Sequence, residues 1–376
     1  LGERFPLTLE AGVDLRGLAG PRAVFIVCDN PWVPVLQVKA GKDSRARLAD
    51  FTLVGGWTAL QVESTGGGQQ GSRLELARLA LEDGGCALSL ATASAVPAGV
   101  LDLTLDDCLL AGHWGNGVQL LPAAGTLRCL LRNTVVQNNG GTGLVCRPAA
   151  GVKTSLELVH CTVARNGSWG LAGDRPGIAL TARNSILWGN GQGDYRGVDG
   201  GGIHHCLLAT GAALGSRGNR SGDPAFLDAR DWHLGRGSAA LGIGDPGPAG
   251  LPPRDLDGQL RPPSTAPDAG ADQQELHTLT QDPRGMRIYR DFTLRAWTWP
   301  GASVASSPTT RSPPASPSLP WRGCSSWTTP RPWSWPGRGR PTPGASSISG
   351  APDSAPSPCS VRRWPSRASP STAGGP

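Results

Sequence analysis

The chain has 376 residues, of which 54 are glycine and 34 proline, while aromatic residues make up only 5%. Its formal net charge of +6 comes from the C-terminal stretch, because residues 300–376 hold eight arginines and a single acid, Asp353. The remainder is near neutral and has no basic stripe of the kind that grips phosphates, which argues against a nucleic-acid partner. No apolar run reaches about 18 residues, so we expect no transmembrane segment.

A short pattern recurs at a nearly constant spacing between Asp50 and Leu208. Each copy is a polar residue, then a small or apolar one, then a short β-prone run. The polar residues are Asp50, Arg78, Asp107, Asn133, His160, Asn184 and His205. The steps between the residues that follow them are 28, 29, 26, 27, 24 and 21 residues. A period of this size predicts a solenoid, in which each repeat buries its apolar side against its neighbours.

The composition of each repeat predicts strands and sharp bends. Runs such as 101–105, 127–130 and 156–159 alternate or are apolar over four or five residues, as strands do. Gly and Asn follow, as in Asn138–Gly141, and these residues tolerate positive φ. A second strand restarts after each bend, which leaves no room for a helix. The fold predicted is all-β, a single parallel β-helix.

The pattern resembles the right-handed parallel β-helix of the pectin-lyase-like superfamily over roughly residues 1–275. The front of the chain, at 2–7 and 12–17, is similar to a family of unknown function that begins such helices. The back resembles the choice-of-anchor Q group of bacterial surface proteins. The segments that carry this second resemblance are 184–190, 223–226, 233–234, 237–240, 255–258 and 268–272. Ala239, Gly242 and Ala269 depart from the usual residues of that group.

Three segments are expected. Residues 1–215 form the right-handed β-helix, with N-terminal turns missing because the chain begins inside the family pattern. Residues 216–275 cap its C-terminal end, since an open last coil would expose unpaired strand edges. Residues 276–376 form a low-complexity tail rich in Pro, Ser, Arg and Trp, for which we predict disorder. This tail is either an out-of-frame translation of a GC-rich gene or a cell-wall-binding linker.

Cysteines and possible metal ligands point to structure rather than to a metal site. Cys108, Cys161 and Cys206 share one repeat position, but two strand spacings separate successive members, about 9.6 Å, too far for a disulfide. We expect small buried side chains there; whether Cys129 and Cys146 pair is left open. Residues 255–258 have the D-x-D-G form of a calcium loop, but Ala266 replaces its last ligand, which favours a tight turn.

Two hypotheses for function follow from the repeat. If the protein is a polysaccharide lyase or hydrolase acting on uronates, the catalytic candidates are Arg78, Asp107, Asp83 and Arg132, with Ca²⁺ as the only cofactor. The preferred hypothesis is non-catalytic: an exported or surface-associated protein that presents a lateral face to a polysaccharide or cell-surface glycan, or has a structural, adhesive role. No cofactor is then expected. The binding candidates are Trp57, Trp114, Trp169 and His160, because aromatic rings cover apolar sugar faces.

Overall fold

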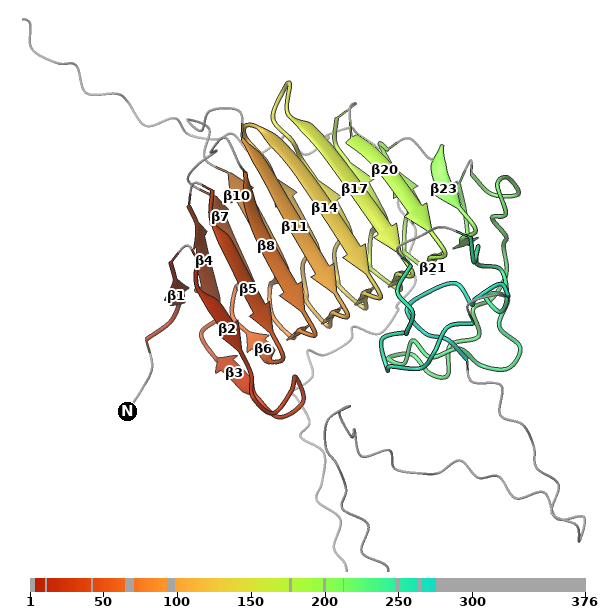
Figure 1. Cartoon of the computed structure of the whole chain (residues 1–376), viewed down its shortest axis with the longest axis horizontal. Helices are drawn as coiled ribbons and strands as arrows, with labels where there is room; N and C mark the ends of the chain where they lie inside the picture. The colour runs from red at the N-terminus through yellow and green to blue at the C-terminus, as the bar shows by residue number, and fades with distance from the viewer. Residues whose placement is uncertain are drawn as a thin grey trace, which may run out of the picture. The chain divides into compact units, whose positions relative to one another are not determined.

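The computed structural model describes residues 4–274, except for 11, 42, 65–70, 93–98, 176–177, 199–200, 212, 248–250 and 263–264. Within these residues the chain forms strands and no helix, and the strands build a single right-handed parallel β-helix (Figure 1). The predicted fold class is therefore confirmed. The tail for which we predicted disorder, 276–376, lies outside the described residues.

Each coil of the β-helix contributes one strand to each of three sheets, which we call sheets A, B and C. Sheet A contains β1 (Leu7–Leu9), β4 (Leu36–Ala40), β7 (Thr58–Ser64), β10 (Cys86–Thr92), β13 (Val118–Leu121), β16 (Leu144–Cys146), β19 (Trp169–Gly173) and β22 (Gly193–Arg196). Sheet B contains β2 (Asp14–Arg16), β5 (Arg45–Ala49), β8 (Ser72–Ala77), β11 (Val100–Asp106), β14 (Thr126–Arg132), β17 (Lys153–Val159), β20 (Ile178–Arg183) and β23 (Gly202–His204). Sheet C contains β3 (Phe25–Cys28), β6 (Thr52–Gly55), β9 (Ala80–Glu82), β12 (Leu109–Ala111), β15 (Val135–Gln137), β18 (Thr162–Ala164), β21 (Ile186–Trp188) and β24 (Leu207–Leu208).

Parallel register places equivalent side chains of successive coils directly above one another. Leu88 of β10 pairs with Leu60 of β7 on one side and with Val118 of β13 on the other, and all three are fully buried. Along β11, buried and partly exposed residues alternate strictly. The interior is therefore a set of aliphatic columns, and each coil buries its apolar face only against the coils above and below.

The corner between sheets B and C is formed by the repeating polar residue. All seven members, from Asp50 to His205, have φ between 45° and 68°. All seven positions therefore have left-handed backbone, which Asn and Asp tolerate better than most other residues with a side chain. Vertical hydrogen bonds join several of them: Asn133 Nδ2 donates to Asp107 (3.1 Å), and Asn184 bonds His160 Nε2 (3.1 Å).

A buried amide ladder holds the corner between sheets C and A. Asn139 Nδ2 donates to Asn166 Oδ1 (3.0 Å), and Asn166 Nδ2 donates to Asn190 Oδ1 (2.9 Å). His113 begins the ladder, because its backbone N–H donates to Asn139 Oδ1 (3.2 Å). These groups are buried, so their hydrogen bonds to one another satisfy donors and acceptors that water cannot reach.

The segment 216–274, which we call the closing segment, covers the last coil and then crosses the outer face of sheet C (green to cyan in Figure 1). Asn219 accepts the N–H of Cys206 in the last coil. Leu234 and Ala269 pack against Ile186 and Leu207 of sheet C. Contacts continue back to β15, where Gln137 Nε2 donates to the carbonyl of Arg230 (2.8 Å). The closing segment therefore clamps several coils together from the side, in addition to covering the end expected of a cap.

The seven cysteines among the described residues are free thiols, and Cys129 and Cys146 are not bonded to each other. Cys108, Cys161 and Cys206 are fully buried at the position after the polar corner residue. Burial raises the pKa of each of these three thiols to about 12, so they remain protonated. The expectation of small buried side chains at this position is confirmed.

Candidate functional site

Three tryptophan side chains stand exposed at the N-terminal part of the corner between sheets C and A. Trp57 lies between β6 and β7, Trp114 lies between β12 and β13, and Trp32 lies on the longer connection between β3 and β4. Their exposed fractions are 47%, 59% and 79%, respectively. Large aromatic residues at this level of exposure carry an energetic cost in water, so a cluster of them marks a surface suited to contact with something else.

The three rings contact one another. Trp32 and Trp57 are nearly parallel, with ring centroids 6.5 Å apart, and Trp57 meets Trp114 edge-on at 5.0 Å. Trp57 and Trp114 belong to coils separated by one intervening coil, whose corner is Gly84–Gly85. A Cβ atom on Gly85 would lie 3.0 Å from Cζ2 of Trp114 and 2.1 Å from the carbonyl oxygen of Trp57. The intervening coil thus has no side chain at this place, and the rings meet above it.

The structure brings two of the four proposed binding residues together and separates the others. Trp169 is the first residue of β19, and its ring lies over Gly193 of the next coil: a Cβ there would be 2.8 Å from Trp169 Cζ3. His160 is completely buried under the closing segment, and burial lowers its pKa well below the usual value. His160 therefore does not reach the surface, and its hydrogen bond with Asn184 is a contact within the polar column. Trp32, which sequence reasoning missed, joins Trp57 and Trp114.

The four proposed catalytic residues do not converge. Arg78, Asp107 and Arg132 lie near the corner between sheets B and C, whereas Asp83 follows β9 at the corner between sheets C and A. Burial raises the pKa of Asp107, and Asn133 donates to its carboxylate. The acid is thus held within the polar column of the corner.

Both arginines of this group are bound to carboxylates. Arg78 makes a two-pronged contact with Asp50 (2.6 and 2.9 Å), and Arg132 makes one with Asp106 (2.6 and 2.7 Å). Burial acts to raise the pKa of Asp50, but the hydrogen bonds and charges of Arg78 and Arg16 lower it below the usual value. Because each guanidinium is paired with a carboxylate, neither is available as the base that β-elimination requires.

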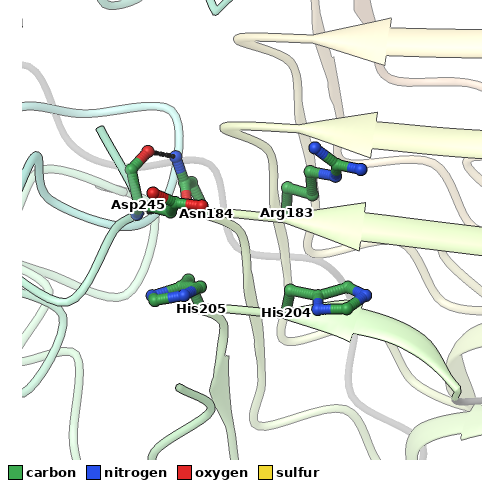
Figure 2. Close-up of a pocket in the computed structure, with 5 residues that line it drawn as sticks. All are labelled: Arg183, Asn184, His204, His205 and Asp245. Atoms are coloured by element: carbon green, nitrogen blue, oxygen red, sulfur yellow. Dashed lines mark hydrogen bonds between the residues drawn. The ribbon is translucent and has the colours of Figure 1, made fainter. Parts of the chain in front are cut away.

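A small pocket of about 240 Å³ lies where the closing segment meets the ends of β20 and β23. Figure 2 shows Arg183 and His204 pointing to one side of it, and Asn184, His205 and Asp245 lying on the other. Asn184 bonds the backbone of Asp245 at both ends of its amide (2.8 and 3.0 Å), and His205 Nδ1 bonds the carbonyl of Ile243 (3.0 Å). These contacts anchor the closing segment, which accounts for Asn184, His205 and Asp245.

The closing segment also contains a compact charged cluster, which sequence reasoning missed. The ligand atoms of His233, Asp257 and Asp272 lie within 4.8 Å of one another. Both ring nitrogens of His233 already bond carboxylates, Nδ1 to Asp231 and Nε2 to Asp257 (2.7 Å). Burial acts to lower the pKa of His233, but the hydrogen bond and charge of Asp257, helped by Asp231, raise it to about 10. A protonated imidazole therefore occupies the centre of this cluster and ties two loops of the closing segment together.

Comparison of the chain with protein-family models, with curated proteins and with solved structures finds no match. In the part of the chain that the structure describes, no helix has the length and apolar character needed to cross a membrane.

Proposed function

We propose that this is a non-catalytic, exported or surface-associated β-helix protein that binds polysaccharide through the exposed cluster of Trp32, Trp57 and Trp114. We also propose that it is a relative of the pectin-lyase-like proteins, close to the choice-of-anchor Q group. The parallel β-helix and the ordered motifs at 184–190, 223–226 and 268–272 support that relationship.

The observation that carries the binding proposal is the contact between three exposed indole rings on a rigid scaffold. Sugar rings have apolar faces that stack on indoles, and rigid side chains lose little conformational freedom when they bind. The corner that holds Trp57 and Trp114 is fixed by stacked strands on both sides, so the rings keep their relative positions.

The alternative, a lyase or hydrolase acting on uronates, has less support. Such an enzyme needs a free base beside acids that neutralise the substrate, with Ca²⁺ in many cases. Arg78 and Arg132 are each held by a carboxylate, and Asp83 is at a different corner from both.

The proposal is tested by the affinity of the protein for soluble polysaccharides when the tryptophans are removed. We expect Trp57→Ala with Trp114→Ala to lower the affinity about tenfold or more, because two stacking contacts of about 1 kcal/mol each are lost. Phe25→Ala is the control, since Phe25 is also an exposed aromatic residue (56%) but lies on the outer face of sheet C. Equal affinity of the double variant and the parent would contradict the proposal.

Incubation with pectate and alginate, with and without Ca²⁺, distinguishes the alternative. We expect no rise in the absorbance of unsaturated products. A rise that Arg78→Ala or Asp107→Ala abolishes would instead establish a lyase.

A further inference from the structure

The tryptophan cluster opens onto a line of residues that follows the same corner toward the C-terminal coils and begins with three glycines. From Trp57 the line runs through Gly85, Gly115 and Gly141, and then through Ser168 and Gln192. Backbone hydrogen bonds connect these residues in steps of one coil: Gly115 N–H donates to Gly85, Gly141 to Gly115, Ser168 to Gly141 and Gln192 to Ser168. A second line lies beside it and contains Trp114, Gly140, Gly167 and Gly191. We call the two lines together the corner track.

The fold itself requires the glycines of the corner track. A Cβ atom on Gly140, Gly167 or Gly191 would lie 2.3–2.4 Å from the carbonyl oxygen of the preceding coil. No other residue type fits such an approach without moving the coils apart. The consequence is a strip of bare backbone, and Gly140, Gly167 and Gly191 are exposed on it.

The corner track carries no charged residue. Its side chains beyond the tryptophans are the hydroxyl of Ser168, which is half-buried, and the amide of Gln192, which is exposed. Both groups donate and accept hydrogen bonds, as the hydroxyls of a sugar do. Asp29 comes three residues before Trp32 in the chain, Asp83 comes two residues before Gly85, and both are exposed acids. A polymer of uronates would bring its carboxylates toward these acids and would meet no cation on the track itself.

We propose that the corner track is the path of a neutral polysaccharide chain, which lies lengthwise across the coils with its sugar rings stacked on Trp57 and Trp114 and its far end bonded to Ser168 and Gln192. This inference rests on the proposed function and specifies its ligand class. The coils from Trp57 to Gln192 span about 24 Å at ~4.8 Å per coil. The track is therefore long enough for several consecutive sugars, and affinity should grow with chain length beyond the part that covers the tryptophans.

The test measures the affinity for a neutral disaccharide and for a neutral hexasaccharide, with cellobiose and cellohexaose as one pair and xylobiose and xylohexaose as another. The parent protein is compared with variants that place a bulky side chain on the far part of the corner track. Ser168→Tyr and, independently, Gln192→Tyr should weaken hexasaccharide binding on the order of tenfold while leaving disaccharide binding unchanged. The unchanged disaccharide affinity also shows that the variants fold. Ser155→Tyr is the matched control, because Ser155 has similar exposure but lies on the outer face of sheet B. Polygalacturonate should bind more weakly than the neutral hexasaccharides.

The failures of the two proposals are distinguishable. If both track variants bind the hexasaccharides like the parent while Trp57→Ala weakens binding, the ligand contacts the tryptophans alone, and the path proposed here is wrong. If polygalacturonate binds more tightly than the neutral chains, the assignment of a neutral ligand is overturned. If neither the tryptophan nor the track variants change the affinity for any chain, the proposed function fails together with this inference.

Discussion

A single amide in the ladder at the corner between sheets C and A connects three coils. Asn166 accepts the side-chain and backbone N–H groups of Asn139 (3.0 and 3.2 Å), and its own amide donates to Asn190 and to the carbonyl of Val136 (2.9 and 3.1 Å). The residue is buried, so loss of its amide leaves several of these groups without a partner and without water. Each such group costs about 1–3 kcal/mol.

We therefore expect Asn166→Ala to lower the free energy of unfolding by about 3 kcal/mol or more, measured by urea denaturation. Gln192→Ala, which removes an exposed amide at the same corner, should change it by less than about 0.5 kcal/mol. If the two variants were equally stable, the ladder would not contribute to the stability of the coils.

At the same scale, sequence reasoning identified the polar residues of the corner between sheets B and C better than it identified the tryptophan cluster at the corner between sheets C and A. The polar column from Asp50 to His205 recurs at one period, and its residue types tolerate positive φ, so its role is readable without coordinates. The tryptophan cluster depends instead on register. Trp57 precedes its strand and meets Trp114 across the coil that has Gly85 at this corner. Trp169 lies one residue further along its own coil than Trp57 does, inside β19, and its ring covers Gly193. Trp32 lies on an irregular connection before the counted repeats, where no period exists to place it.

At the scale of elements, the closing segment is held by a protonated histidine, and its contribution to stability should depend on pH. The pKa of His233 is raised from 6.5 to about 10 because the bonds to Asp257 and Asp231 outweigh burial. Its stabilising effect is therefore complete below about pH 6.5 and is lost as the pH rises through about 10. Asp272, whose pKa burial raises to about 6, is largely ionised at pH 7, whereas Asp255, whose pKa burial raises to about 7, ionises at the lower end of that window and adds a decrease of its own near pH 7.

We expect the free energy of unfolding to fall between pH 7 and pH 10 in the parent protein, and to fall less in His233→Gln, which cannot carry the charge. Urea denaturation across this range measures both. Parallel decreases in the two proteins would show that other groups cause the pH dependence.

The position of the closing segment could be predicted only in part. Its turns are local, and the turn at 255–258 forms as expected, with Gly258 N–H donating to the carbonyl of Asp255. Its docking depends on residues far apart in the sequence. Asn133 donates to the carbonyl of Arg254 (2.7 Å), and Arg261 donates to Asn133 (3.2 Å). A pattern of short motifs carries no information about which outer face such a segment will cover.

At the scale of the whole β-helix, the closing segment and the tryptophan cluster lie toward different ends of the repeat region. The closing segment contacts sheet C from β15 to β24, with Leu109 of β12 at the edge of that contact, whereas Trp57 lies two coils before β12. Trp114 follows β12, and the far part of the corner track lies in the coils that the closing segment covers. A β-helix is held mainly by contacts between neighbouring coils, so a weakness in one part need not spread to the other. Trp232 is the residue to remove, because it is nearly buried against Val135 and Ala271 where the closing segment meets β15.

Trp232→Ala should cost about 3–5 kcal/mol at that interface. We expect amide hydrogen exchange to accelerate in β15, β18 and β21, with little change in β4, β7 and β8. We also expect the affinity for polysaccharide at the tryptophan cluster to persist at temperatures where the C-terminal coils remain folded. Trp57→Ala should give the converse result, with weaker binding and unchanged exchange in β15–β21. Uniform acceleration over all coils in Trp232→Ala would mean that the helix unfolds as one unit, and that the exposed cluster depends on the clamp at its other end.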